Sequence, residues 1–166
     1  LHKEYRRQRQ MCIRDRAKLT HVTNMPLKSL LSSKLAEAFD KGIHCHVEVE
    51  EGVFFTDMRV LDLITITSIL CDNAIEAAVL SETPKLSIAI FKMEGQSVIA
   101  VENSTKEASI DIAPLKQRGF STKGTGRGLG LANIEEILFR YDNVSLETES
   151  AQHRFVQLLS VTPKQD

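Results

Sequence analysis

The sequence predicts a two-layer α/β sandwich in which helices pack on one face of a mixed β-sheet. Some segments repeat apolar residues at helical spacing, whereas others alternate apolar and polar residues as half-buried strands do. These segments follow the order helix, strand, helix, strand, strand, helix, strand, strand, which does not alternate as a doubly wound parallel sheet would. With 166 residues, 42% of them hydrophobic, the chain can bury one ordinary core.

The first half of the chain begins this order. A helix is expected from Pro26 to a stop at Gly42, because apolar residues recur there at helical spacing. Residues 43–50 alternate as a strand and place His44 and His46 together on its polar face. Two histidines could form a metal pair, but no third ligand is evident. A long helix is then expected over residues 57–80, with a core-facing side made of Val60, Ile64, Thr67, Leu70, Ala74 and Ala78.

The second half adds two pairs of strands and a further helix. Residues 85–103 hold two β-rich runs hinged at Glu94, Gly95 and Gln96, which predicts a hairpin. A short helix over 112–116 leads into a glycine-rich stretch, and helical spacing resumes near Gly128. The last two strands are expected near 143–148 and 153–162.

Composition bounds the class of protein. The chain has 21 Lys+Arg against 22 Asp+Glu, so no overall field favours nucleic acid as a partner. No apolar run reaches the roughly 20 residues that span a bilayer. Residues 1–18 are expected to form an arm or linker and residues 19–166 the folded domain. Within the arm, MCIRDR resembles the translation of a transposon end used in sequencing libraries, so residues 1–16 carry no functional weight.

The helix over 57–80 carries the first candidate site. Asp72, Asn73 and Glu76 are spaced i,i+3 and i,i+4, so they project from one sector of the helix. A solvated surface face is one explanation of this pattern. Alternatively, an amide oxygen flanked by carboxylates suits Mg²⁺, which prefers hard oxygen ligands and keeps several waters.

The second candidate site follows the strand that ends at Val101. Glu102, Asn103 and Ser104 come just past its last apolar residue. They could form a turn. They could equally reach a ligand at the sheet edge, where a carboxylate would accept a hydrogen bond from an exocyclic amine.

The third candidate site is the stretch GFSTKGTGRGLGL, which holds five of the chain's eight glycines. Glycines let backbone N–H groups approach an anion, and the helix that resumes near Gly128 adds the positive end of a dipole. Lys123 and Arg127 add charge, while Ser121 and Thr122 add hydroxyls. A flexible loop is the alternative, because the stretch matches neither the dinucleotide fingerprint nor the P-loop.

Taken in order, LCDNAIEAA, VENS and GFSTKGTGRGLGLANI resemble the N, G1 and G2 boxes of the GHKL ATPase superfamily. The resemblance covers about residues 19–162, is closest to the ATP-binding domain of sensor histidine kinases, and implies the Bergerat fold of that superfamily. The phrases LKSLLSSKLAEAFDKGI and GFSTKG..RGLGL resemble the peptide-pheromone quorum-sensing kinases of Gram-positive bacteria.

The resemblance implies roles for individual residues. Asn73 would hold the Mg²⁺ ion that bridges the ATP phosphates. Glu102 or Asn103 would occupy the place of the G1 aspartate, which hydrogen-bonds the adenine amino group. Lys123 would lie in a mobile lid near the terminal phosphates. The lid and the G2 turn would complete the ATP site with Ser121, Thr122, Lys123, Gly124, Arg127, Gly128, Leu129 and Gly130.

Two positions depart from the family pattern. The G1 motif D-x-G-x-G is absent, because ENSTK has Glu for Asp and neither glycine. Ile69 stands four residues before Asn73, where the ATPase branches carry a general-base glutamate at or near that position. Because isoleucine cannot accept a proton, hydrolysis of ATP by water is disfavoured. His2 and His21 lack the acidic neighbour of a phospho-accepting histidine, so the acceptor is expected outside this chain.

The implied function is therefore that of a catalytic domain with ATP and Mg²⁺ as cofactors. It would transfer the γ-phosphoryl group to a histidine on an upstream dimerisation domain, for relay to a response regulator. The domain would be the cytoplasmic part of a membrane-anchored, homodimeric sensor kinase. A serine kinase of the anti-sigma-factor type and a non-catalytic interaction module with a degenerate nucleotide site are the alternatives.

Overall fold

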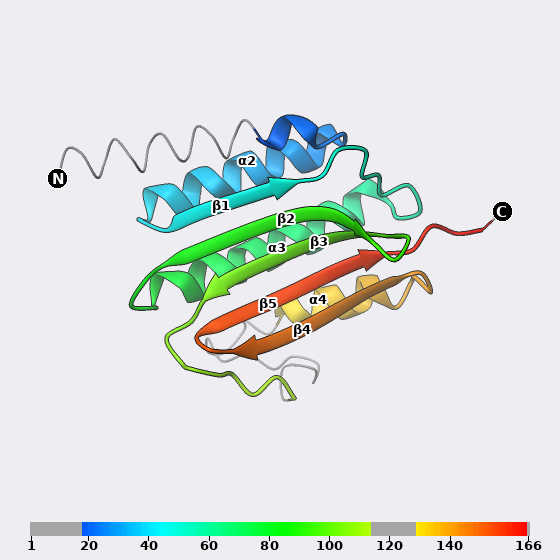
Figure 1. Cartoon of the computed structure of the whole chain (residues 1–166). Helices are drawn as coiled ribbons and strands as arrows, with labels where there is room; N and C mark the ends of the chain where they lie inside the picture. Colours follow the sequence, from blue (N-terminus) through cyan, green and yellow to red (C-terminus); the bar gives the residue numbers. More distant parts are fainter. Residues whose placement is uncertain (1–17, 114–128, 166) are drawn as a thin grey trace.

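A computed structural model describes residues 18–113 and 129–165 and confirms the mixed sheet with helices on one face. Its five strands lie in the order β1-β2-β3-β5-β4 (Figure 1). The strands are β1 (His44–Val49), β2 (Lys85–Met93), β3 (Gln96–Ser104), β4 (Val144–Ala151) and β5 (Arg154–Val161). Only β1 and β2 pair in parallel, while the other neighbouring strands are antiparallel.

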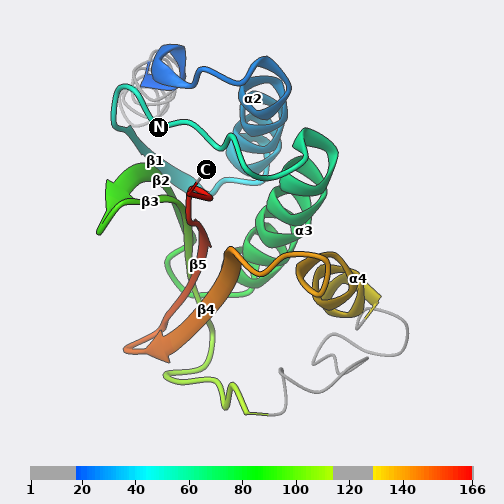
Figure 2. The same cartoon turned by 90° about the vertical axis from the view of Figure 1, so that its right-hand side faces the viewer.

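Three helices cover one face of this sheet, and Figure 2 shows them side by side with α3 in the middle. They are α2 (Met25–Asp40), α3 (Val60–Val79) and α4 (Leu129–Leu138), and a short 3₁₀ turn, η1 (Leu19–His21), precedes them. Helix α3 packs against β3 as well as against both neighbouring helices. It is therefore the element that joins the two layers.

Local sequence explains where the first elements begin and end. The Asn24 side chain accepts a hydrogen bond from the Leu27 N–H at 3.0 Å and caps α2, with Pro26 in the first turn. Gly42, with φ of 77°, ends the helix in the left-handed region. The predicted hairpin between β2 and β3 is confirmed, and Glu94 and Gly95 both have positive φ in its two-residue turn.

Two details of the sequence prediction are wrong. Helix α3 starts at Val60, which is 43% exposed rather than core-facing, because its buried positions begin at Asp62 and Leu63; the predicted core residue Ile64 is only half-buried. The later core positions Thr67, Leu70, Ala74 and Ala78 are buried as expected. Residues 112–113 are not helical, and the rest of the expected short helix lies outside the described residues.

Cys71 on α3 is fully buried, and burial raises the pKa of its thiol to about 12. A thiol in the unfolded chain ionises near a pKa of about 8.5. Between these values the unfolded state binds fewer protons, so the free energy of unfolding should fall by up to about 1.4 kcal/mol per pH unit. Urea unfolding from about pH 8 to 11 should show this slope, and Cys71→Ala should reduce it. An identical slope in the variant would contradict the prediction.

Within residues 18–113 and 129–165, no helix combines the length and apolar character needed to cross a membrane.

Candidate functional site

The polar sector of α3 contains residues in three different environments. Asn73 is half-buried, Asp72 is half-buried and paired with a lysine of α2, and Glu76 is exposed. Lys34 on α2 reaches across and donates a hydrogen bond to the Asp72 carboxylate. Burial alone would lower the pKa of Lys34, but its hydrogen bond to Asp72 and the charge of that carboxylate raise it overall. Asp72 is thus committed to an ion pair between two helices.

Lys34 is a residue that the sequence analysis did not select. Its side chain is only 16% exposed, and its ammonium also lies 3.9 Å from a carboxylate oxygen of Glu37. A signal was available, because Lys34 is three residues after Leu31 and four before Ala38, both buried. A lysine beside the apolar stripe of a helix indicates a partner on the neighbouring element.

Glu102 and Asn103 lie on opposite faces of the sheet, since successive side chains on a strand alternate. Asn103 is 3% exposed and lies on the helix-covered face, with the core residue Val101 two positions before it. Glu102 lies on the open face, where Arg154 of β5 contacts both carboxylate oxygens at 2.8 and 2.9 Å. Of these two residues, therefore, only Asn103 faces the layer of helices that contains α3.

The start of α4 rests directly on α3. A Cβ atom placed on Gly130 would lie 3.2 Å from Cγ2 of Ile69. Ile69 is one helical turn before Asn73 and shares its side of α3. This contact places Gly130 one helical turn from Asn73 along α3.

Gly130→Ala is expected to destabilise the chain by about 1 kcal/mol, because the β-branched side chain of Ile69 has little rotamer freedom to yield on a helix. In the Ile69→Ala background the same change should be neutral or stabilising, because alanine favours helix. Urea unfolding of the two single variants and the double variant measures this difference. Equal effects of Gly130→Ala in both backgrounds would contradict it.

Most of the remaining predicted site residues fall in a segment that the structure does not describe. Ser121, Thr122, Lys123, Gly124, Arg127 and Gly128 all lie in 114–128, outside the described residues. Leu129 is the first residue of α4. In the described part of the chain, no group of three His, Cys, Asp or Glu side chains could hold a metal ion. The histidine pair of β1 therefore finds no third ligand among these residues.

A family model described as GHKL domain matches residues 58–162. Sensor protein CitS of Bacillus subtilis (strain 168) is 26% identical over 119 residues, which are 70% of this chain and 22% of CitS. The catalytic domain of histidine kinase ThkA superposes with a TM-score of 0.68 at 22% identity, covering 83% of this chain and 93% of that domain. Full-length ShkA in complex with AMPPNP gives a TM-score of 0.62 at 18% identity, covering 82% of this chain and 29% of ShkA.

The chain belongs to the GHKL domain family, because the matched segment runs from the start of α3 to the end of β5 and exceeds half of the chain. Within that family, its fold is the one seen in the catalytic domains of histidine kinases. The chain spans about a fifth (22%) of the length of CitS.

Proposed function

We propose that this chain is the ATP-binding catalytic domain of a sensor histidine kinase. The observation that carries the proposal is that β3 and α4, which bear two of the predicted site residues, both pack against α3, which bears the third. Asn73 comes from α3 itself, Asn103 from the helix-covered face of β3, and Gly130 from the start of α4. The GHKL family and the kinase catalytic domains of the same fold support this assignment.

In the proposed nucleotide site, each of these elements would contact a different part of the nucleotide. Asn103 would contact the adenine amino group through its amide oxygen. Backbone N–H groups at the start of α4 would meet phosphate at the positive end of the helix dipole. The proposed lid, with Ser121, Thr122, Lys123, Gly124, Arg127 and Gly128, would cover the phosphates.

The chemistry of Asn73 fits a magnesium ion. Because Lys34 occupies Asp72, the ion would have one neutral protein ligand and would complete its shell with phosphate oxygens and waters. Such a bound ion neutralises charge on the phosphates. The residues of the chain would position the nucleotide, with α3 and β3 orienting its two ends.

The acceptor of the phosphoryl group is proposed to be a histidine outside this chain. Ile69, in contact with Gly130, offers no proton acceptor for a hydrolytic water. Among the described histidines, His21 is engaged with Glu51 at 3.1 Å. Relay to a response regulator, homodimerisation through an upstream domain and a cytoplasmic location in a membrane-anchored kinase complete the proposal. Two further points stay predictions: the relationship to quorum-sensing kinases, and the boundary at residue 18 between the N-terminal arm and the folded domain.

The function is tested by supplying the chain with γ-labelled ATP, Mg²⁺ and a separately produced histidine phosphotransfer domain of its own full-length protein. We expect label on the histidine of that domain, stable to base and labile to acid. Label on a serine of a partner would instead favour the anti-sigma-factor type of kinase. If the chain does not bind nucleotide at millimolar ADP, the remaining hypothesis is that it is a non-catalytic interaction module.

Asn103→Ala is expected to weaken ADP binding about tenfold, because it removes a buried polar contact to the base. Glu102→Gln is the matched neighbour, and on the open face of the sheet it should leave ADP affinity unchanged. Isothermal titration of both variants measures the contrast. A larger loss for Glu102→Gln would assign the G1 position to the other residue.

A further inference from the structure

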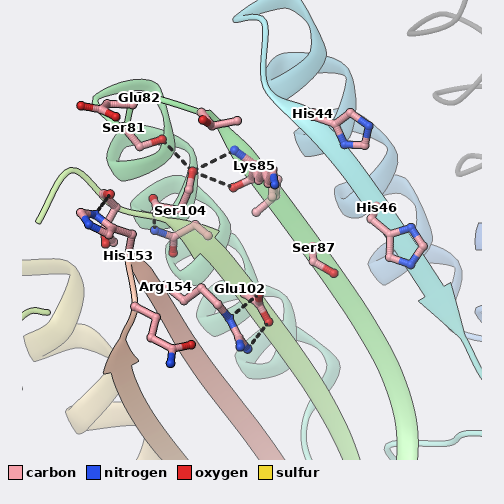
Figure 3. A pocket seen from close by; sticks show the side chains of 15 residues that line it. His44, His46, Ser81, Glu82, Lys85, Ser87, Glu102, Ser104, His153 and Arg154 are labelled. Atoms are coloured by element: carbon pink, nitrogen blue, oxygen red, sulfur yellow. Dashed lines mark hydrogen bonds and ion pairs between the residues drawn. The ribbon is translucent and has the colours of Figure 1, made fainter. Parts of the chain in front are cut away.

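A pocket of about 640 Å³ lies mainly on the open face of the sheet, at the end where β1 and β2 begin (Figure 3). We call it the sheet-end pocket. Its lining on this face includes His44, His46, Lys85, Ser87, Glu102 and Arg154. These side chains come from four strands and lie on the open face, while Asn103, on the helix-covered face, also lines the pocket at the sheet end.

The strand register brings the pocket's donors together. His44 lies opposite Lys85, and His46 lies opposite Ser87, across the parallel pair of β1 and β2. Side chains at paired positions on one face are about 5 Å apart at Cβ. One ligand group can therefore touch both strands.

The charges of the pocket favour an anion. Glu102 is its acidic side chain on the open face, and Arg154 neutralises that carboxylate through two contacts at 2.8 and 2.9 Å. The other acidic lining residue, Glu82, points away from Lys85 in Figure 3. Lys85 therefore presents a positive charge with no carboxylate beside it in the pocket, and this charge repels a metal cation.

Several donors of the pocket have no partner within the described part of the chain. The Lys85 ammonium, the His44 ring and the Ser87 hydroxyl make no hydrogen bond or ion pair with any described residue. His46, by contrast, contacts Glu48 at 3.1 Å. Unused donors grouped around one cation are the chemistry that recognises an oxyanion.

We propose that the sheet-end pocket binds a small multivalent oxyanion, of the phosphate or polycarboxylate class. Lys85 supplies the charge, and His44 and Ser87 donate hydrogen bonds from the neighbouring strand positions. The three proposed contacts lie on the opposite face of the sheet from Asn73, and although Asn103 also lines the pocket, none of these contacts uses a residue of the proposed nucleotide site.

The test is a titration of the chain with pyrophosphate and, separately, with citrate, followed by amide chemical shifts at low ionic strength. We expect saturable shifts at residues 44–46 and 85–87. Pyrophosphate binding alone would assign a phosphate ligand, and citrate binding alone a polycarboxylate. Shifts confined to α4 and the polar sector of α3, or no saturation at millimolar concentration, would overturn the proposal.

Variants separate this site from general surface charge. The double change His44→Gln and Lys85→Gln should weaken binding about tenfold, through loss of a charge-assisted contact. Its melting temperature should be unaffected, because neither side chain has a partner in the described part of the chain. Lys92→Gln is the matched control, since Lys92 is also exposed on β2 but lies outside the pocket. An equal loss in both variants would contradict a specific site.

Discussion

Asn73→Ala is expected to abolish the Mg²⁺-dependent rise in melting temperature that ADP gives the wild-type chain. At a hundredfold excess over Kd, a ligand contributes about 2.7 kcal/mol, which corresponds to a shift of about 5–10 °C for a domain of this size. The shift should vanish because the carboxylate next to Asn73 in the sequence is not available to replace it. The adjacent Asp72 is held by Lys34 on α2. Thermal unfolding with and without ADP and Mg²⁺ measures this directly.

Two variants make the result specific. Asp72→Asn should lower the melting temperature without ligand, because it breaks the ion pair between α2 and α3, but it should keep the ADP shift. Asn133→Ala, an exposed position on α4, should change neither quantity by much. A full ADP shift in Asn73→Ala would remove the metal role from that residue. Loss of the shift in Asp72→Asn would transfer the role to the carboxylate.

Most of the fold could be predicted because individual segments contain local sequence patterns that indicate their secondary structure. The strand over 44–49 alternates cleanly, since only one of its faces is buried. Helix α2 carries its own start and stop signals in Pro26 and Gly42. These signals are local, so no knowledge of the partner element was needed.

The choice between Glu102 and Asn103 could not be made from sequence. Residues 98–101 of β3 read Val-Ile-Ala-Val, so apolar side chains occupy both faces of the strand and hide the alternation. Only the packing of α3 on one of those faces decides that Asn103 lies with the helices. The position of a predicted site residue thus depended on tertiary structure.

Long-range polar pairs were missed for a related reason. Lys34 and Asp72 are 38 positions apart, and each taken alone is an ordinary charged residue of a helix. Their pairing depends on how α2 and α3 are aligned, which residue spacing within one helix does not determine. The same holds for Asp62, whose partners are 78 and 79 positions away.

Tyr141→Phe is expected to cost about 1.5–3 kcal/mol of folding free energy, the range for a hydrogen bond to a charged group. Asp62 is only 5% exposed, and the Tyr141 hydroxyl donates to its carboxylate. The same hydroxyl accepts the Arg59 N–H at 3.2 Å. Burial, reinforced by Asp62, raises the pKa of Tyr141, so the hydroxyl keeps its proton at neutral pH. Arg140, at 3.3 Å and half-exposed, cannot replace that donor fully. Urea unfolding at pH 7 measures the loss.

A double-mutant cycle with Asp62→Ala tests whether the loss belongs to this contact. Once the buried carboxylate is gone, Tyr141→Phe should cost less than about 1 kcal/mol. Phe139→Ala is the control, because that ring is 95% exposed and its removal should change stability by less than about 0.5 kcal/mol. Additive effects of the two changes would contradict the coupling.

The contact between Tyr141 and Asp62 ties the end of α4 to the start of α3, and Gly130 rests on Ile69 at the opposite end of α4. Tyr141→Phe should therefore also weaken ADP binding, although Tyr141 lies at the opposite end of α4 from the proposed nucleotide site.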